Sequence, residues 1–331
     1  MHQKIDFVIP WVDGNDPEWI SEKNRYLNKT GYEADARNIR YRDWDILRYW
    51  FRGAEKFAPW VNKIHFVTWK HVPSWLNLHH PKLHIVNHKD YIPAKYLPTF
   101  SANPIELNMH RIPGLSDNFV YFNDDMFILK PVREEDFFVD GIPCDICVSD
   151  VAPSGQDIYS SIVRNDIACI NKHFDRKESI KKNLFGWFSL KYGSKSFETL
   201  RTLRQEKFSG FWDHHLPSAY KKKTLETVWS KEEELLNATC LHRFRSRSDV
   251  NQYIFRYWRL ASGEFVPHKR LGKCYQMGEE KIYKIIKKQS VKLFCINDGD
   301  ESASLDFDKE RARLIDAFET ILSDKSDYET E

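Results

Sequence analysis

The chain has 331 residues, of which 41% are hydrophobic and 30% are charged, a balance typical of a folded globular protein. Its formal net charge of +2 gives no basic excess of the kind that long nucleic-acid contacts need, so a nucleic-acid partner is not expected. No apolar run approaches the roughly 20 residues that span a bilayer, and the N-terminus has no signal-peptide pattern. We therefore expect a cytoplasmic protein, with peripheral association at the inner face of the membrane as an alternative.

The first 130 residues alternate strand-like and helix-like patterns. Apolar, β-branched runs predict strands over 5–12, 62–69 and 82–88. Apolar residues at helical spacing predict helices over 42–58 and 102–112. A further apolar run completes a β-α-β-β-α-β order, which indicates a layered α/β sheet. In such sheets ligands gather at the carboxyl ends of the strands.

Two acids interrupt that further run, NFVYFNDDMFIL at 118–129, which otherwise predicts one buried strand. An ionised carboxylate is costly to bury without a partner, so Asp124 and Asp125 must meet a cation, hydrogen-bond donors or water. One interpretation is that Asp124 and Asp125 cap a turn and pair with nearby Arg or Lys side chains. A second apolar strand, at 291–300, ends on Asn297-Asp298, and this repetition favours a divalent metal, which prefers hard oxygen ligands.

The remainder of the chain reads mainly as helices. Residues 151–230 show Lys- and aromatic-rich helical patterns without clear strands, and further helices are predicted over 232–238, 249–261, 281–289 and 308–322. The predicted organisation is 1–150 as the α/β part of the core, to which the family resemblance given below assigns nucleotide-sugar binding, 151–230 as a mostly helical insertion, 231–322 as the rest of the core, and 323–331 as a flexible tail.

Two polar stretches offer catalytic groups. His214-His215 lies in FSGFWDHHLPSAY, and a histidine there is a candidate general base because its ordinary pKa lies near working pH. An ordinary loop histidine is the alternative. Arg243, Arg245 and Arg247 alternate and would share one face of an extended chain, as a phosphate clamp requires, although solvated arginines fit equally well. These residues indicate a metal-dependent enzyme acting on a phosphorylated substrate.

The stretch IDFVIPWVDGNDPEW at 5–19 resembles the first signature block of the Stealth family of sugar-phosphate transferases. Residues 40–127 resemble its long second block, HHLPSAY with LHRFRSRSDVNQ its third, and LFCINDGD its fourth. The family includes bacterial capsular and exopolysaccharide phosphotransferases and the catalytic subunit of the lysosomal-enzyme GlcNAc-1-phosphotransferase. The resemblance implies a Rossmann-like, GT-A-related nucleotide-sugar transferase core.

The resemblance also implies a reaction. A hexose 1-phosphate, such as GlcNAc-1-phosphate, would pass from a UDP-sugar to a hydroxyl of a polysaccharide or lipid-linked glycan, leaving a phosphodiester and UMP. The positions that match are Asp125 and Asp298 at a Mg²⁺ or Mn²⁺ ion, Asp124 bracing them from the other face, His215 and Arg245 in catalysis, and Asp13, Gly14, Asn15, Asp16, Arg111 and Arg243 near the donor. Two positions depart from the pattern: Trp44 replaces a small polar residue, and Lys70 replaces a glycine.

Other functions remain open at this stage. A metal-dependent glycosyltransferase that releases UDP is the main alternative, since fold and metal site do not choose between the two reactions. A polysaccharide-binding module, with some of the 11 Trp lining sugar subsites, is another. The basic stretches 281–289 and 220–224 are candidates for peripheral contact with anionic lipid, with a solvated basic face as the alternative.

Overall fold

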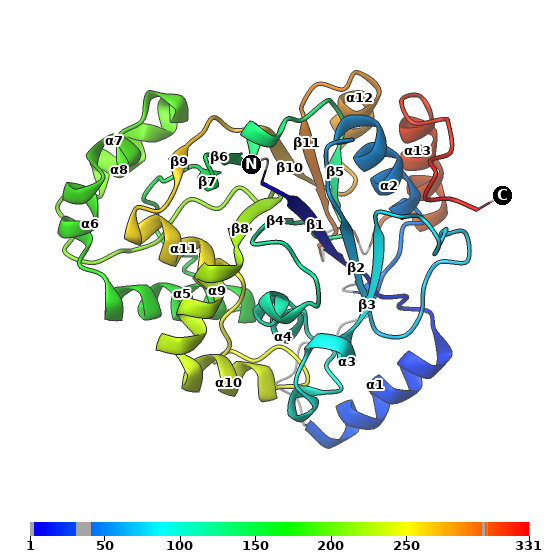
Figure 1. Cartoon of the computed structure of the whole chain (residues 1–331), viewed down its shortest axis with the longest axis horizontal. Coiled ribbons are helices and arrows are strands. Elements are labelled where there is room, and N and C mark those ends of the chain that lie inside the picture. Colours follow the sequence, from blue (N-terminus) through cyan, green and yellow to red (C-terminus); the bar gives the residue numbers. More distant parts are fainter. Residues whose placement is uncertain (1–2, 31–40, 300–301, 303, 331) are drawn as a thin grey trace.

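The computed structural model describes residues 3–30, 41–299, 302 and 304–330 (Figure 1). Asp300, the last residue of the predicted acidic strand end, lies outside the described residues, as does Glu331 of the predicted tail. Among the described residues, no helix combines the length and the apolar character that a bilayer span requires.

The largest sheet has the strand order β3-β2-β1-β4-β8. Its strands are β1 (Ile5–Pro10), β2 (Ile64–Thr68), β3 (Leu83–Asn87), β4 (Asn118–Tyr121) and β8 (Ser218–Lys221). The first four run parallel, and β8 runs antiparallel to β4. The direction of strand succession reverses between β1 and β4, and Rossmann-like sheets open a ligand crevice at such a reversal, beyond the carboxyl ends of the strands. The α/β, Rossmann-like fold class predicted from the sequence is confirmed.

Both faces of this sheet are covered, and the alternation of side chains along β1 divides the core in two. Ile5, Phe7 and Ile9 belong to one apolar cluster, and Val8 belongs to the other. The first cluster includes side chains of α2 (Leu47–Phe57), α12 (Lys281–Lys287) and α13 (Phe307–Glu319). The second includes side chains of α5 (Ile158–His173), α9 (Lys222–Lys231), α10 (Glu233–Leu241) and α11 (Tyr253–Ser262). Figure 1 shows these two groups of helices on opposite sides of β1.

The prediction of one strand over 118–129 is wrong. The run divides into β4 and β5 (Met126–Ile128), and the two strands belong to different sheets. In the second sheet, β11 (Leu293–Asn297) pairs with β10 (Gly272–Gln276) in parallel and with β5 in the antiparallel direction. The two acids therefore lie in the turn that joins one sheet to the other.

The region 151–230 is largely helical as predicted, with α6 (Arg176–Lys182), α7 (Leu184–Trp187) and α8 (Ser196–Arg201) following α5. The expectation that it holds no strand is wrong, because β8 lies within it and forms an edge of the main sheet. A third, small sheet contains β6 (Phe138–Val139), β7 (Ile142–Asp145) and β9 (Val266–Pro267). The remaining elements are α1 (Pro17–Thr30), α3 (His88–Tyr91), α4 (Ala102–Leu107), and the short 3-10 helices η2 (Ala94–Tyr96), η3 (Met109–Arg111), η4 (Glu134–Asp136) and η5 (Leu190–Lys195).

The C-terminal residues 323–330 pack against α2, which contradicts the prediction of a flexible tail. Tyr328 is buried in the first apolar cluster. The Arg52 guanidinium of α2 donates two hydrogen bonds to the Glu329 carboxylate, at 2.7 and 2.9 Å. Both side chains of this pair are nearly inaccessible to solvent, so the contact is a buried ion pair that holds the end of the chain in place.

We predict that Arg52→Ala lowers the free energy of unfolding by about 3 kcal/mol, because it leaves the buried Glu329 carboxylate without its partner. Chemical denaturation measures this loss, and limited proteolysis should then cut within 323–331. Lys56→Ala on the same helix, an exposed residue, is the matched control and should change stability by less than about 0.5 kcal/mol. Equal stability of Arg52→Ala and the parent chain would contradict the packed tail.

Candidate active site

Strand pairing brings three distant segments to one place at the carboxyl ends of β1 and β4. Since β8 is antiparallel to β4, with Tyr121 opposite Ser218, the residues just before β8 lie beside those just after β4. Since β11 is antiparallel to β5, with Cys295 opposite Met126, the end of β11 lies beside the same turn. The segments that meet are 123–125, 214–215 and 295–298.

An open cleft of about 590 Å³ lies at this meeting point. Five of the residues predicted from the sequence line it: Asp124, Asp125, His215, Arg245 and Asp298. Five aromatic side chains, of Trp11, Tyr41, Trp44, Tyr159 and Tyr253, also form part of its wall. A cleft with apolar faces and a few convergent charged groups is the usual form of a small-molecule site.

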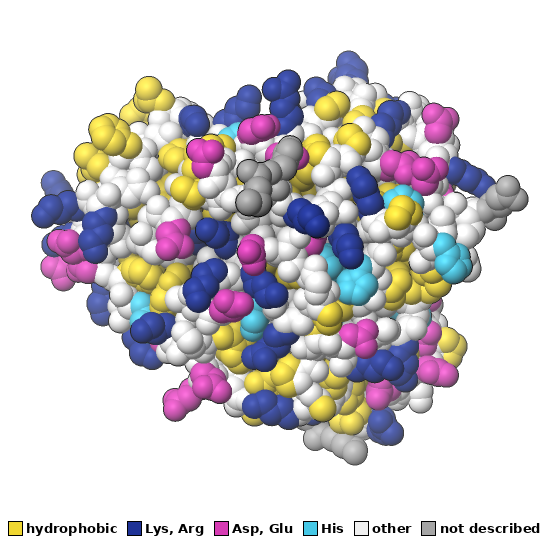
Figure 2. Space-filling view, in the orientation of Figure 1, with side chains coloured by type: hydrophobic (Ala, Val, Ile, Leu, Met, Phe, Trp, Pro, Cys, Tyr) yellow, Lys and Arg dark blue, Asp and Glu magenta, His cyan; other side chains and the backbone are white. Residues whose placement is uncertain are grey.

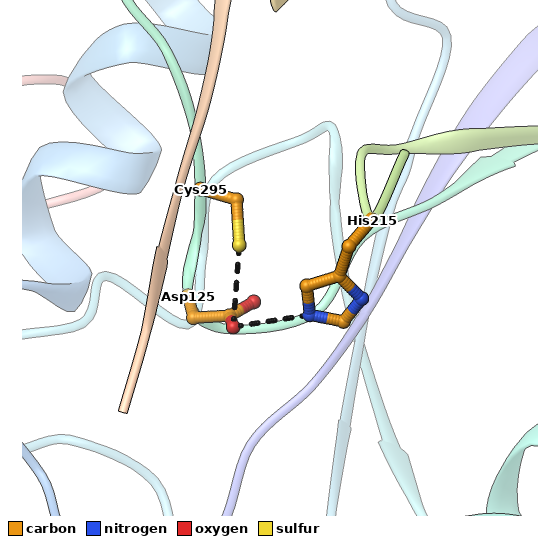
Figure 3. A group of neighbouring side chains, drawn as sticks. All are labelled: Asp125, His215 and Cys295. Atoms are coloured by element: carbon orange, nitrogen blue, oxygen red, sulfur yellow. Dashed lines mark hydrogen bonds and ion pairs between the residues drawn. The ribbon is translucent and has the colours of Figure 1, made fainter. Parts of the chain in front are cut away.

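Asp125 occupies the centre of the converging segments (Figure 3). Its Oδ2 lies 3.4 Å from His215 Nε2 and accepts a hydrogen bond from Cys295 Sγ at 3.5 Å. Its Oδ1 is buried and has no hydrogen-bond partner in the described part of the chain. A buried carboxylate oxygen without a donor is unfavourable, so this atom is a natural ligand for a cation.

Asp124 lies next to it, open to the water of the cleft but with protein on most sides. This enclosure, together with the negative charges of Asp125 and Asp43, raises the pKa of Asp124 to about 7. Enclosure and neighbouring acids also raise the pKa of Asp43, another residue of the cleft wall. The cleft floor therefore holds more negative charge than the protein itself compensates, which is the electrostatic condition for binding a cation.

Asp298 follows β11, and its carboxylate is already engaged. Arg42 donates to both of its oxygens, at 2.9 and 2.5 Å, and Trp44 Nε1 donates at 2.8 Å. Ser302 also donates a hydrogen bond to it. A role for Asp298 as a ligand beside Asp125 would require it to share or exchange these donors. Trp44, which departs from the family pattern, therefore has a structural role as a hydrogen-bond donor to Asp298.

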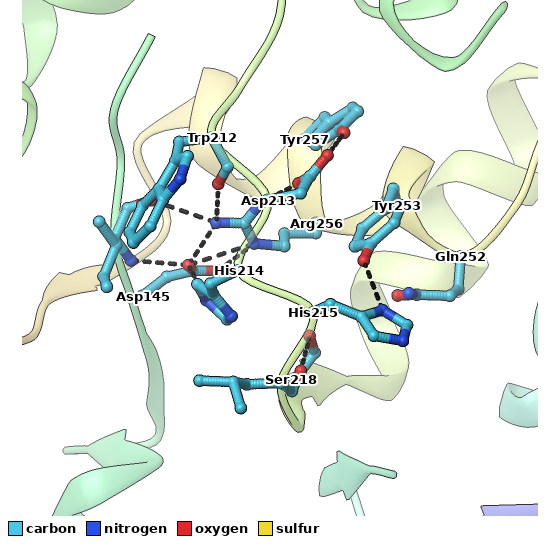
Figure 4. Close-up of polar contacts among 12 residues, drawn as sticks. Asp145, Trp212, Asp213, His214, His215, Ser218, Gln252, Tyr253, Arg256 and Tyr257 are labelled. Carbon is cyan, nitrogen blue, oxygen red and sulfur yellow. Dashed lines mark hydrogen bonds and ion pairs between the residues drawn. The ribbon is translucent and has the colours of Figure 1, made fainter. Parts of the chain in front are cut away.

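His215 is held in a strained position beside Asp125. Its φ is 44°, in the left-handed region that non-glycine residues rarely adopt, and such strain is often found at functional sites. Its Nδ1 lies 3.4 Å from the Tyr253 hydroxyl (Figure 4). Burial would lower the pKa of His215, but the Asp125 carboxylate outweighs it and raises the pKa to about 9. A cation bound to Asp125 would compete for the same carboxylate and weaken the cause of this shift.

A buried ionic network anchors the chain just before His215 (Figure 4). Arg256 of α11 donates to Asp145 at 2.9 Å and to Asp213 at 2.6 Å, and Arg259 donates to Asp145 at 2.5 Å. Burial alone would raise the pKa of Asp145, but the two guanidinium groups hold it well below its usual range. His214 lies 3.8 Å from Asp145, so the same network fixes both members of the His214-His215 pair.

The turn that follows β1 does not line the cleft, although its neighbours Trp11 and Val12 do. Asp16 caps α1 by accepting a hydrogen bond from the Trp19 amide at 2.8 Å, and it lies 3.3 Å from His71 Nδ1. Asp13 Oδ1 accepts from the Asn15 amide. A side chain on Gly14 would collide with the Tyr41 carbonyl, so glycine is required for the close approach of the segment that carries Arg42. These residues shape the cleft rim, and contact with a donor stays a prediction for them.

Of the three arginines predicted at the site, one lines the cleft and two do not. Arg245 lines the cleft, and its charge opposes the burial that raises the pKa of Glu106, a buried acid on the same wall. Arg243 is outside the cleft wall and donates to the Lys95 carbonyl at 3.3 Å. Arg111, at the end of η3, places its guanidinium 4.9 Å from the centre of the Trp229 ring, also outside the cleft wall. The structure brings only Arg245 of the three to the acids and the histidine. Lys70, the other departure, is exposed and places its ammonium over the Trp69 ring.

Sequence reasoning did not identify several cleft residues. Arg42, Asp43 and Glu106 are charged side chains inside the second block, and their spacing from apolar neighbours was that of surface positions. Cys274 lines the cleft too, and its Sγ lies 3.2 Å from that of Cys295 on the neighbouring strand. The alternation RYRDWD at 40–45 was the one available signal, since charges within an apolar block need partners.

The residues present fit a hard divalent cation. Asp125 and Asp124 offer carboxylate oxygens, one of them buried and without a donor, and Mg²⁺ and Mn²⁺ prefer such ligands. The nearby Cys295 is a poorer ligand, because burial raises the pKa of its thiol well above the usual value and keeps it protonated.

Comparison with known proteins identifies the family. Residues 3–31 match the family model described as Stealth protein CR1, conserved region 1, and residues 40–144 match Stealth protein CR2, conserved region 2. Curated polysaccharide phosphotransferases also match this chain over 99% of its length. The chain belongs to the Stealth family, as the sequence resemblance predicted.

Three bacterial proteins illustrate these relatives. The capsular polysaccharide phosphotransferase WcwK of Streptococcus pneumoniae is 38% identical over 331 residues, covering 99% of this chain and 98% of its own. The receptor polysaccharide phosphotransferase WefC of Streptococcus gordonii is 41% identical, covering 99% and 100%. The exopolysaccharide phosphotransferase cps2G of Lactiplantibacillus plantarum is 36% identical, covering 98% and 96%. These relatives confirm the expectation that the chain is an enzyme of the phosphotransferase type.

Among solved structures, the galactosyltransferase LgtC in complex with donor and acceptor sugar analogs aligns over 94% of this chain and 95% of that chain. The identity is 9% and the TM-score is 0.39, too low to establish a shared fold or activity.

We predict that Arg256→Met lowers the free energy of unfolding by about 3–5 kcal/mol, because it leaves the buried Asp145 and Asp213 carboxylates with too little positive charge. Arg256→Lys keeps the charge but loses the planar fork, so its loss should be intermediate. Denaturant titration measures both, with Arg247→Met on the surface as the matched control. If Arg256→Met left the free energy of unfolding unchanged, the network would not be what holds the His214-His215 segment.

Proposed function

We propose that the chain transfers a hexose 1-phosphate from a UDP-sugar to a hydroxyl of a polysaccharide or lipid-linked glycan, forming a phosphodiester and releasing UMP. The observation that supports this most is the meeting of Asp125, His215 and Arg245 in one cleft at the β1–β4 edge, in a member of a family whose relatives are named polysaccharide phosphotransferases. The cleft wall includes an acid for a cation on the diphosphate, an arginine for the phosphoryl oxygens and a histidine for the proton of the acceptor hydroxyl.

Asp125 would hold Mg²⁺ or Mn²⁺ together with Asp298, whose carboxylate would share its donors Arg42 and Trp44, and Asp124 beside Asp125 would brace the site. Such an ion, when bound, neutralises negative charge on a diphosphate. The protein's own contribution is the Asp125 Oδ1 atom, which has no donor among the described residues, beside an Asp124 whose pKa is raised.

His215 and Arg245 would act on the reacting groups. The acceptor oxygen forms a new bond to the β-phosphorus of the donor, and the bond between that phosphorus and the UMP oxygen breaks. The sugar C1–O bond survives, so its configuration is retained. The His215 imidazole takes the proton of the acceptor hydroxyl, and Arg245 stabilises negative charge on the phosphoryl oxygens. Tyr253 orients the His215 ring through its Nδ1.

A metal-dependent glycosyltransferase remains the alternative reaction for the same cleft. In that case attack falls on the anomeric carbon, the C1–O bond breaks, and UDP leaves. The two reactions differ in which bond of the donor breaks, so the released nucleotide distinguishes them directly.

We predict that the purified protein, given UDP-sugars, Mn²⁺ or Mg²⁺ and a glycan acceptor, releases UMP and leaves an intact sugar 1-phosphate in the product. Asp125→Asn should lower UMP release by at least about a hundredfold while leaving the fold unchanged, because the amide cannot supply the negative charge at the cleft floor. Asp117→Asn, an exposed acid before β4, is the matched control and should retain activity. Chromatography of the nucleotides is the measurement.

Each outcome has a distinct meaning. UDP in place of UMP, with a direct glycosidic bond in the product, would make the chain a glycosyltransferase. Full activity of Asp125→Asn would remove the metal-binding role from that residue. Glycan binding by the parent chain without turnover of any UDP-sugar would favour a binding module.

A further inference from the structure

Exposed apolar side chains concentrate on one part of the surface, in the segment that precedes the His214-His215 pair. We define the outer lobe as residues 181–207, which contain the end of α6, α7, η5 and α8. Of the eleven large hydrophobic side chains exposed among the described residues, six belong to the outer lobe: Leu184, Phe185, Leu190, Phe197, Leu200 and Leu203. Figure 2 shows hydrophobic side chains projecting at the upper left, over the position of α7 and α8 in Figure 1.

The outward orientation of these side chains is fixed by others that point inward. Trp187 is fully buried and stacks against Phe208, with ring centres 5.9 Å apart, while Phe185, two residues earlier, is 89% exposed. Tyr192 is buried and donates a hydrogen bond to the Gly186 carbonyl at 2.6 Å, while Leu190 is 96% exposed. The lobe therefore has its own aromatic anchors, and its apolar tips are displayed by a packed structure.

The outer lobe is also the basic part of the chain. It holds seven basic residues and two acidic ones, a net charge of 7 − 2 = +5, whereas the whole chain has a net charge of +2. Its basic residues are Lys181, Lys182, Lys191, Lys195, Arg201, Arg204 and Lys207. Apolar tips set among lysines and arginines are the pattern of a surface that lies in the headgroup region of a membrane, with the tips at the acyl boundary and the cations beside anionic lipid.

The two basic stretches expected to contact lipid are less suited to it. The apolar side chains of α12, Ile282 and Ile286, are fully buried in the core shared with α13. Tyr220 and Leu225, on either side of the other lysine run, are fully buried as well. Ile285, the remaining isoleucine of α12, is partly buried against the same core, so those stretches present charge to solvent without a highly exposed apolar side chain.

We propose that the outer lobe docks the protein on an anionic lipid bilayer by inserting Phe185 and Leu190 between the headgroups. A second protein is the other class of partner for exposed apolar side chains. The apolar tips and the seven basic residues belong to one short segment, and this combination complements a surface of mobile negative headgroups. The inference goes beyond the proposed sugar-phosphate transfer and does not depend on it.

Flotation of the full chain with vesicles tests this proposal. In about 0.1 M salt, the protein should float with phosphatidylcholine vesicles that contain about one third phosphatidylglycerol, and much less with phosphatidylcholine alone. Phe185→Ser with Leu190→Ser should lower partitioning by about tenfold or more, since both apolar groups then lose their burial in the membrane. Leu78→Ser with Leu241→Ser, exposed leucines elsewhere, is the matched apolar control and should bind like the parent chain.

Charge reversal provides the second arm. Lys181→Glu with Lys182→Glu should weaken binding to the anionic vesicles. Lys284→Glu on α12 with Lys288→Glu directly after it changes the net charge by the same amount and should not. All these positions are exposed, so thermal unfolding should be unchanged and UMP release with a soluble acceptor should persist. Loss of vesicle binding with intact turnover thus separates this inference from the proposed function.

Three results would overturn the proposal. The parent chain could stay at the bottom of the gradient with anionic vesicles, or the Phe185→Ser, Leu190→Ser protein could float as well as the parent. A parent dimer that this double substitution converts to a monomer, without vesicle binding, would identify the outer lobe as a contact between copies of the chain.

Discussion

The turn at Asn123–Asp125 joins two sheets, and the candidate site depends on that junction. β4 is fixed between β1 and β8, and β5 is fixed beside β11, so the chain between them has few conformations open to it. Antiparallel pairing on each side then places the start of β8 and the end of β11 against the same turn. His215 and Asp298, far apart in sequence, reach one cleft because of hydrogen bonds between strands that carry no catalytic group themselves.

The junction also explains why acids are tolerated within an apolar run. A continuous strand would bury Asp124 or Asp125 in a sheet face, whereas a turn at the edge opens both toward the cleft. Arg42 and Trp44 donate hydrogen bonds to the Asp298 carboxylate at the end of β11. Arg256 and Arg259 donate hydrogen bonds to the buried Asp145 carboxylate. The Asp125 Oδ1 atom has no donor among the described residues. This oxygen belongs to a residue of the cleft wall, so a cation in the cleft could reach the turn.

The sequence predicted the fold class and the main catalytic candidates because those depend on local patterns. Apolar runs identified β1, β2, β3 and β11, and acids at strand ends identified Asp125 and Asp298. The division of 118–129 was not predictable from periodicity, because a run buried on both faces has the same pattern in one sheet or in two. The polar tail SDKSDYETE concealed the buried Tyr328 and Glu329. The pairing of Arg42 with Asp298 spans 256 residues and has no local signal.

The central claim is that the acids in the turn between β4 and β5 bind a divalent cation beside His215. Crystals grown with Mn²⁺ and UDP and measured at a wavelength where manganese scatters anomalously would test it most directly. The account predicts an anomalous peak within bonding distance of an Asp125 carboxylate oxygen, and no such peak in Asp125→Asn crystals. A well-ordered cleft with UDP bound and no peak at Asp125, or a peak only at the other acidic clusters of the chain, would contradict it.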